Sequence, residues 1–148
     1  MTAPTVVEYV VQRLSELGID RVFGVPGDYA FPIDDAIEVC PSLEWIGCAN
    51  ELNAAYAADG YARRTGAAIL TTTYAVGELR AINGVMGSKA HRLPVFHLVG
   101  APSRRIMASR ATLATIDAAE MESAVASPLT MARQGQERRG GSEPSTIT

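Results

Sequence analysis

The sequence predicts a three-layer α/β/α domain with a mostly parallel sheet over residues 1–103. First, short β-prone segments alternate with helical segments long enough to cross between parallel strands. Second, the strand segments 67–72 and 95–99 are apolar throughout instead of alternating, which is typical of parallel strands covered on both faces. Third, hydrophobic residues make up 47% of the 148-residue chain, enough for the core of one domain.

The first half of this domain is expected to begin with a helix. Apolar residues recur at helical spacing over Val6–Leu17, and Gly18 is a natural terminator. The β-prone segment Arg21–Val25 follows, and the turn-forming residues 26–29 end it. A second helix is expected over Ile33–Val39.

The second half continues the alternation. Leu43–Cys48 is expected to be a strand, followed by an alanine-rich helix over Glu51–Thr65. Ala67–Thr72 is the next strand, Val76–Lys89 the next helix, and Val95–Val99 an apolar strand. The helices between successive strands are the crossovers that a parallel sheet requires.

The composition changes after Ser103. We expect a divergent helical continuation over residues 104–132, with one amphipathic helix over Thr115–Val125. Residues 133–148 are rich in Gly, Ser, Pro and charged residues, and contain one aliphatic residue, Ile147. Such a segment buries too little apolar surface to offset its ordering entropy, so we predict a disordered tail.

Charge and cysteine content exclude several classes of protein. The net charge of −3 gives no attraction to nucleic acid or to an anionic membrane surface. The first 20 residues lack the basic start and apolar stretch of a signal peptide, so we expect a cytoplasmic protein. Cys40 and Cys48 match neither a metal-binding pair nor a disulfide framework, and we interpret them as small buried hydrophobes.

The candidate site lies where the carboxyl ends of the strands meet. In an open α/β sheet, ligands bind beyond these ends. The connections over residues 26–29, 49–51 and 73–77 should therefore converge at one edge. They contain no glycine-rich phosphate loop, and Asp28 would repel a phosphate. A flavodoxin-like nucleotide binder is therefore the weaker of the interpretations.

These connections instead offer two carboxylates, Asp28 and Glu51, among mostly apolar neighbours. Carboxyl groups in such surroundings can hold or exchange a proton near neutrality. The alternatives are structural: a glutamate in a first helical turn is favoured by the helix dipole, and an aspartate after glycine is a common turn residue. His91 and His97 show no metal-binding spacing, and we expect no metal ligands in this chain.

Four stretches together carry a resemblance to a known family. They read GVPGDY, ELNAAYAADGYAR, VGELRAINGV and LPVFHLVGAPS, in order between Val6 and Ser103. This region resembles the N-terminal, pyrimidine-binding domain of thiamine diphosphate-dependent 2-oxoacid decarboxylases, which include pyruvate and indolepyruvate decarboxylases. The resemblance implies the thiamine diphosphate-binding fold, which is flavodoxin-like. It also implies non-oxidative decarboxylation of a 2-oxoacid to an aldehyde and carbon dioxide.

The resemblance also implies roles for individual residues. The glutamate matching Glu51 hydrogen-bonds the ring nitrogen N1′ of the cofactor and makes its 4′-amino group acidic. The aspartate matching Asp28 lies over the reactive carbon and assists protonation or orientation of intermediates. The resemblance thus implies that Glu51 and Asp28 are the catalytic residues. The residues implied in cofactor binding are Glu51, Pro26, Gly27, Thr73, Val76 and Gly77.

The chain departs from the family pattern at several places. Ala75 stands where the family has Gly, and Arg80 where it has Ser. The family's His-His pair has no counterpart, and Arg110 lies near where it should be. The family holds diphosphate and Mg²⁺ on a separate C-terminal domain, whose GDG…NN-type motif these 148 residues lack.

We therefore expect an N-terminal domain or truncated form of a decarboxylase that is inactive alone. In the family the active site is shared between two subunits. We accordingly expect a homo-oligomer, or pairing with a diphosphate-binding domain. The alternative is a non-catalytic binding or assembly module that retains the fold.

Overall fold

A computed structural model of the chain describes residues 3–109. The predicted tail over 133–148, the helix expected over 115–125 and most of the continuation over 104–132 lie outside these residues. The described elements are α1 (Val6–Ser15), β1 (Arg21–Gly24), α2 (Phe31–Glu38), β2 (Glu44–Gly47), α3 (Glu51–Thr65), β3 (Ala68–Thr73), α4 (Val76–Ala90), β4 (Val95–Gly100) and α5 (Arg104–Ser109).

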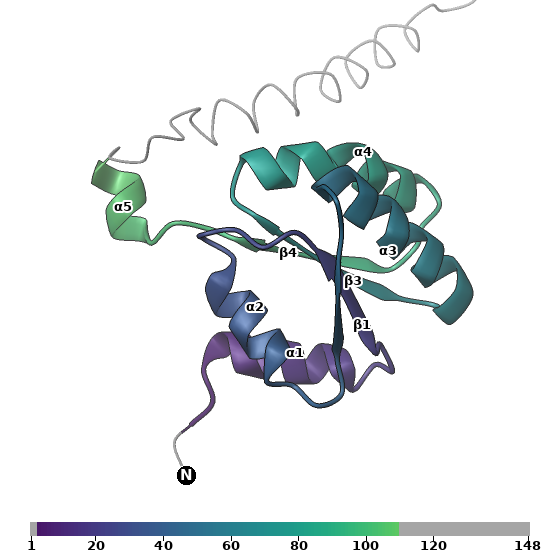
Figure 1. Cartoon of the computed structure of the whole chain (residues 1–148), viewed down its shortest axis with the longest axis horizontal. Helices are drawn as coiled ribbons and strands as arrows, with labels where there is room; N and C mark the ends of the chain where they lie inside the picture. Colours follow the sequence, from purple (N-terminus) through teal and green to yellow (C-terminus); the bar gives the residue numbers. More distant parts are fainter. Residues whose placement is uncertain (1–2, 110–148) are drawn as a thin grey trace, which may run out of the picture. The chain divides into compact units, whose positions relative to one another are not determined.

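The four strands form one sheet in the order β2-β1-β3-β4, and every neighbouring pair is parallel. Helices α1 and α2 cover one face, and α3 and α4 cover the other (Figure 1). The predicted three-layer α/β/α fold is therefore confirmed. None of the helices within residues 3–109 combines the length and apolar character that a membrane crossing requires.

Helix α3 has the bounds that the sequence predicts because strong signals mark both of its ends. Before it, the Asn50 side chain accepts a hydrogen bond from the backbone N–H of Asn53 at 3.0 Å. After it, Gly66 takes a left-handed conformation with φ of 101°, which only glycine adopts without strain. Glu51 is thereby held in the first turn of the helix.

The structure corrects one expectation about an apolar segment. Helix α1 ends at Ser15, so Leu17 lies beyond the helix and is 61% exposed instead of belonging to its apolar face. Strand β4 is at the edge of the described sheet, and Phe96 on it is 37% exposed. Side chains of this strand nevertheless pack against the clusters on both faces of the sheet, Val95 on one face and Leu98 on the other.

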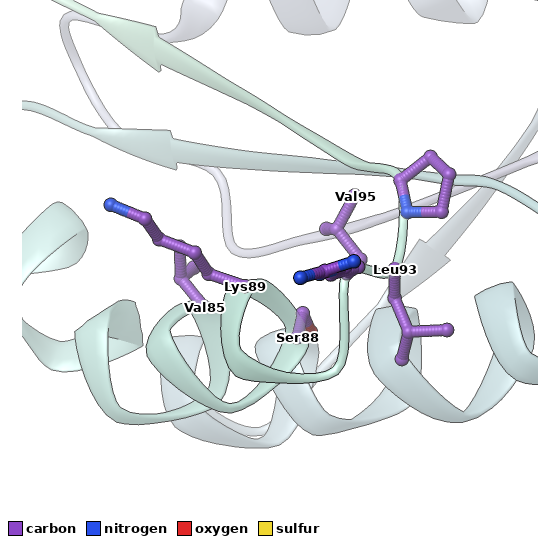
Figure 2. A pocket seen from close by; sticks show the side chains of 7 residues that line it. Val85, Ser88, Lys89, Leu93 and Val95 are labelled. Atoms are coloured by element: carbon purple, nitrogen blue, oxygen red, sulfur yellow. The ribbon is translucent and has the colours of Figure 1, made fainter.

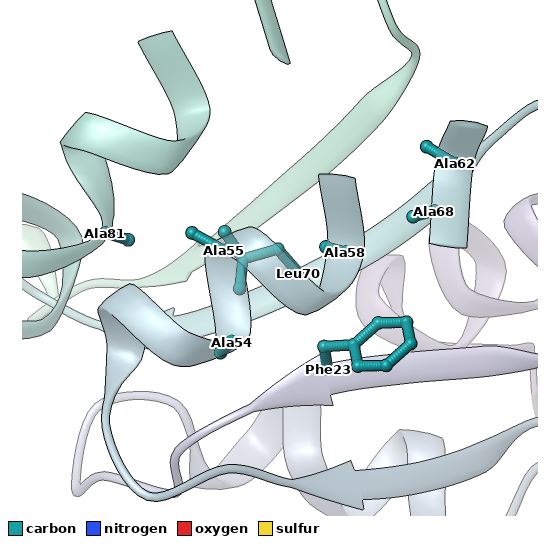
Figure 3. Close-up of a cluster of buried hydrophobic side chains, with 8 residues drawn as sticks. All are labelled: Phe23, Ala54, Ala55, Ala58, Ala62, Ala68, Leu70 and Ala81. Atoms are coloured by element: carbon teal, nitrogen blue, oxygen red, sulfur yellow. The ribbon is translucent and has the colours of Figure 1, made fainter. Parts of the chain in front are cut away.

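The two faces of the sheet are packed with side chains of different size. We call the cluster under α3 and α4 the alanine layer (Figure 3), and the cluster under α1 and α2 the aliphatic layer. The buried members of the alanine layer are Phe23, Ala54, Ala55, Ala58, Ala62, Ala68, Leu70 and Ala81. The buried members of the aliphatic layer are Val11, Leu14, Ile19, Val22, Ile37 and Ile69.

Candidate functional site

The site predicted from the sequence lies at the carboxyl edge of the sheet. The chain passes from β1 to β2 on one side and from β3 to β4 on the other, so the strand order reverses between β1 and β3. Such a switch point leaves a crevice in which open α/β sheets bind ligands. The connections after β1 and β3 leave the sheet on either side of this switch point.

Glu51 carries the most enclosed carboxylate of the predicted site. Its side chain is 15% exposed. A Cβ placed on Gly77 would lie 3.2 Å from Oε1 of Glu51, so this oxygen faces the start of α4. The first turn of α3 favours a negative charge through the helix dipole, in agreement with the structural interpretation. The structure adds that this carboxylate faces a neighbouring helix and not bulk water.

Two glycines let the surrounding loops approach one another closely. A Cβ on Gly27 would lie 2.5 Å from Cβ of Thr73, and a Cβ on Gly77 would lie 3.2 Å from Cγ2 of Thr73. Side chains at these glycines would fill the space between the loops. The structure therefore brings together four predicted site residues, which are Gly27, Glu51, Thr73 and Gly77.

The other predicted site residues lie on the surface of the same edge. Pro26 and Asp28 are exposed, and Val76 is 64% exposed. For Asp28 this differs from the expectation that both carboxylates lie among apolar atoms. The turn places the carboxylate in water, where the Val25 and Pro26 side chains do not enclose it.

Arg80 is a neighbour of Glu51 that the search for apolar surroundings missed. Its Nε atom lies 3.8 Å from Oε2 of Glu51, so the carboxylate lies beside a charge as well as beside small residues. Sequence reasoning identified Arg80 as an unusual charge in this helix. Both residues lie in the first two turns of adjacent helices, but Glu51 is the first residue of α3 and Arg80 the fifth of α4, so the sequence alone gives no register that pairs them.

The connection between β3 and α4 contains a strained residue. Ala75 has φ of 56° and ψ of −85°, and it is only 4% exposed. Residues with a side chain rarely adopt a positive φ, and the strain is about 1–3 kcal/mol. The resemblance implies glycine at this position, and glycine would relieve the strain.

Two partly buried polar pairs lie on opposite faces of the sheet near the site. Thr71 donates a hydrogen bond to Oδ1 of Asp34 at 3.3 Å, whereas Oδ2 is buried without a hydrogen-bond partner. Burial raises the pKa of Asp34 to about 6. On the other face, Oγ1 of Thr72 and Nε2 of His97 lie 2.9 Å apart, and burial lowers the pKa of His97 to about 4.

Sequence analysis did not identify Asp34 as partly buried. The signal was present, because Asp34 follows the apolar Ile33 on the short helix α2 and precedes Ala36 and Ile37. Within residues 3–109, no group of three or more His, Cys, Asp or Glu side chains is arranged to hold a metal ion.

A surface pocket lies away from the predicted site, between the end of α4 and the start of β4 (Figure 2). Its volume is about 430 Å³. Because β4 begins there, the pocket opens near the amino ends of the strands, at the opposite edge from Glu51. Its lining residues are Val85, Ser88, Lys89, Arg92, Leu93, Pro94 and Val95.

Comparison with known proteins identifies the family. Residues 4–121 match the model described as thiamine pyrophosphate enzyme, N-terminal TPP binding domain. The chain belongs to this family. The resemblance to the N-terminal domain of thiamine diphosphate-dependent enzymes is therefore confirmed.

Individual relatives lead to the same assignment. The chain is 52% identical over 111 residues to an alpha-keto-acid decarboxylase of Mycobacterium avium (strain 104), covering 75% of this chain and 20% of that protein. It is 52% identical over 110 residues to that of Mycobacterium leprae (strain TN), covering 70% and 19%. For Mycobacterium tuberculosis (strain ATCC 25618 / H37Rv) the identity is 48% over 109 residues, covering 74% and 20%. The matched region spans about a fifth of the length of these relatives.

Proposed function

We propose that this chain binds the aminopyrimidine end of thiamine diphosphate, as part of a decarboxylase that converts a 2-oxoacid to an aldehyde and carbon dioxide. The observation that carries the proposal is the position of Glu51. Its carboxylate is largely enclosed, lies at a helix N-terminus, and faces Gly77 at the edge where the predicted loops converge.

The residues present fit such a ligand. The absence of side chains at Gly27 and Gly77 lets both loops approach Thr73 closely, which brings their backbones together as a wall for a flat ring. Glu51 supplies an acceptor that can share a proton with a ring nitrogen. The proposal assigns Gly27, Thr73 and Gly77 to the walls of the pyrimidine site, and the exposed Pro26 and Val76 to its rim.

When bound, thiamine diphosphate supplies an acidic carbon and an electron sink for the loss of carbon dioxide. The chain's own contribution is to hold the pyrimidine ring and to move one proton. Glu51 shares this proton between a carboxylate oxygen and the ring nitrogen, in a site from which the close packing of Gly77 excludes water. Asp28, exposed at the rim, is proposed to orient substrate or to assist a later protonation.

Diphosphate and Mg²⁺ are assigned to a separate domain, as the resemblance implies. Since charged groups supply the strongest contacts to a diphosphate, the chain alone should bind the cofactor weakly and should not turn over. The large apolar side chains exposed on α3 and α4, Tyr56, Val76 and Met86, agree with pairing to a second copy or to the diphosphate-binding domain. Light scattering after size-exclusion chromatography tests self-association.

The role of Glu51 is tested by titrating the chain with thiamine diphosphate and Mg²⁺ in a calorimeter. Glu51→Gln should abolish the binding heat, because the amide cannot share a proton with the ring. Glu8→Gln is the matched control, since Glu8 also lies in a first helical turn but on α1. Equal binding by wild type and Glu51→Gln would reject the proposed role.

Activity of the isolated chain is tested by adding several 2-oxoacids to the same mixture. We expect no release of carbon dioxide. Release that depends on Glu51 would contradict the proposal that the chain is inactive alone. Co-purification of a thiamine-dependent partner chain would instead favour a non-catalytic assembly module.

A further inference from the structure

The carboxylate of Glu51 has an opposite charge beside it. The Nε atom of Arg80 lies 3.8 Å from Oε2 of Glu51. The two side chains differ in environment, because that of Glu51 is 15% exposed and that of Arg80 is 62% exposed. Arg80 is the charged partner that the structure gives to this carboxylate within residues 3–109.

The packing of α3 against α4 accounts for this pair. The helices approach closely where a Cβ on Gly84 would lie 2.6 Å from Cβ of Ala55. Both helices follow strands of one parallel sheet, so they run in the same direction. One turn toward the N-terminus on each helix leads from this contact to Glu51 and Arg80.

The same register continues in the other direction. Four residues after Ala55 and Gly84 are Asp59 and Ser88, and the Ser88 hydroxyl donates a hydrogen bond to Oδ2 of Asp59 at 2.7 Å. Positions 51, 55 and 59 of α3 therefore face positions 80, 84 and 88 of α4. The ion pair is a consequence of this helix register and not an isolated encounter of surface side chains.

The two oxygens of Glu51 have different neighbours. Oε1 faces Gly77, where a Cβ would lie at 3.2 Å, whereas Oε2 faces Arg80. A guanidinium only donates hydrogen bonds and carries a permanent charge. It therefore stabilises the ionised carboxylate, whereas a neutral aminopyrimidine, whose ring nitrogen carries no hydrogen, needs the carboxyl group to supply the shared proton.

We propose that Arg80 is a positioning residue that orients Glu51 when no ligand is bound and competes with the aminopyrimidine for its carboxylate. This inference rests on the proposed function of Glu51. Pyrimidine binding must loosen the ion pair, which lowers the apparent affinity. Because the guanidinium is exposed, added salt screens the pair and weakens the competition.

The probe for the test is 4-amino-5-hydroxymethyl-2-methylpyrimidine, which carries the pyrimidine ring without the charged thiazolium or diphosphate. Its binding to the full chain is measured by calorimetry at pH 7.5, in low salt and in 1 M NaCl. The probe is uncharged at this pH, so salt acts on the protein's own ion pair and not on the probe.

Arg80→Gln should bind the probe roughly three- to fivefold more tightly than wild type at low salt, the range expected for losing one partly exposed ion pair. High salt should raise the wild-type affinity toward that of the variant and leave the variant unchanged. Arg80→Lys keeps the charge and should restore the wild-type salt dependence. Equal affinities of wild type and Arg80→Gln, or a wild-type affinity independent of salt, would overturn the competition.

Glu51→Gln separates failure of this inference from failure of the proposed function. Loss of binding in Glu51→Gln together with no effect of Arg80→Gln rejects the role of Arg80 alone. Binding that does not depend on Glu51, or no binding by any form, rejects the proposed function.

Thermal unfolding tests, without any ligand, whether Arg80 holds the Glu51 side chain in place. If Arg80 holds Glu51, Arg80→Gln should lower the melting temperature by about 1–4 °C in the wild-type background and not in the Glu51→Gln background. Equal shifts in both backgrounds would show that Arg80 does not act on Glu51.

Discussion

The alanine layer and the aliphatic layer cover opposite faces of one sheet, yet they serve different purposes. In the aliphatic layer, large side chains such as Ile37 and Ile69 fill the space between sheet and helices. In the alanine layer, small side chains let α3 and α4 approach each other until Gly84 meets Ala55. Large residues supply buried area, whereas small residues define the register that sets Glu51 opposite Arg80.

The largest expected effect is on the aliphatic layer. Ile69 is 1% exposed in β3, so Ile69→Ala should leave a cavity and lower the free energy of unfolding by about 2–5 kcal/mol. Val39→Ala is the control, since Val39 is 73% exposed and the change should be close to zero. Urea denaturation followed by circular dichroism measures both, and equal losses would contradict the assignment of this core.

The alanine layer should respond to added volume instead. Gly84→Ala puts a Cβ 2.6 Å from that of Ala55, which should lower the free energy of unfolding by about 1–3 kcal/mol. Gly60→Ala is the matched control on α3, where nothing lies within 4 Å of the new Cβ. There the higher helix propensity of alanine should stabilise the chain by about 0.5–1 kcal/mol. If both substitutions changed the free energy of unfolding in the same direction, the close contact between α3 and α4 would be contradicted.

The two faces should also respond oppositely to pH. Asp34 has a folded pKa of about 6 against 3.8, so the stability that it contributes is present at low pH and is lost as pH rises through 6. His97 has a folded pKa of about 4 against 6.5, so its contribution is present above pH 6.5 and is lost as pH falls toward 4. In the wild type these two changes in the free energy of unfolding therefore oppose each other between pH 4 and 6.

Removing one of the two groups should therefore reveal how the other changes the free energy of unfolding with pH. Asp34→Asn should become less stable on acidification from pH 6.5 to 4, and His97→Gln less stable on raising the pH from 4 to 6. We expect each change to be on the order of 1–2 kcal/mol, since both groups are partly exposed to solvent screening. Unfolding by urea at stepped pH checks this, and parallel pH profiles of the two variants would exclude it.

The smallest expected effect is a gain at the edge where both layers end. Ala75→Gly should raise the free energy of unfolding by about 1 kcal/mol, because glycine tolerates the φ of 56°. Ala90→Gly, in the last turn of α4, is the same substitution at an ordinary helical position and should lower it by about 0.5–1 kcal/mol. A loss at both positions would mean that Ala75 is not strained.

Much of this fold could be predicted from local pattern. Alternation of strand and helix segments predicts the layers, and the caps Asn50 and Gly66 define α3 to the residue. The C-terminal end of α1 was predicted less accurately, because its apolar pattern continues to Leu17 although the helix ends at Ser15. The apolar strand 95–99 contributes side chains to the clusters on both faces, Val95 and Leu98, although it lies at the edge of the described sheet.

For the candidate site, the sequence by itself determined which connections converge, because the carboxyl ends of parallel strands always share one edge. It also determined the family, through four stretches in order. Only the tertiary structure decided that Gly27 meets Thr73, that Asp28 is exposed, and that Arg80 reaches Glu51. The physical reason is that these relations depend on how close two helices or loops approach, and side-chain volumes distant in sequence set that distance.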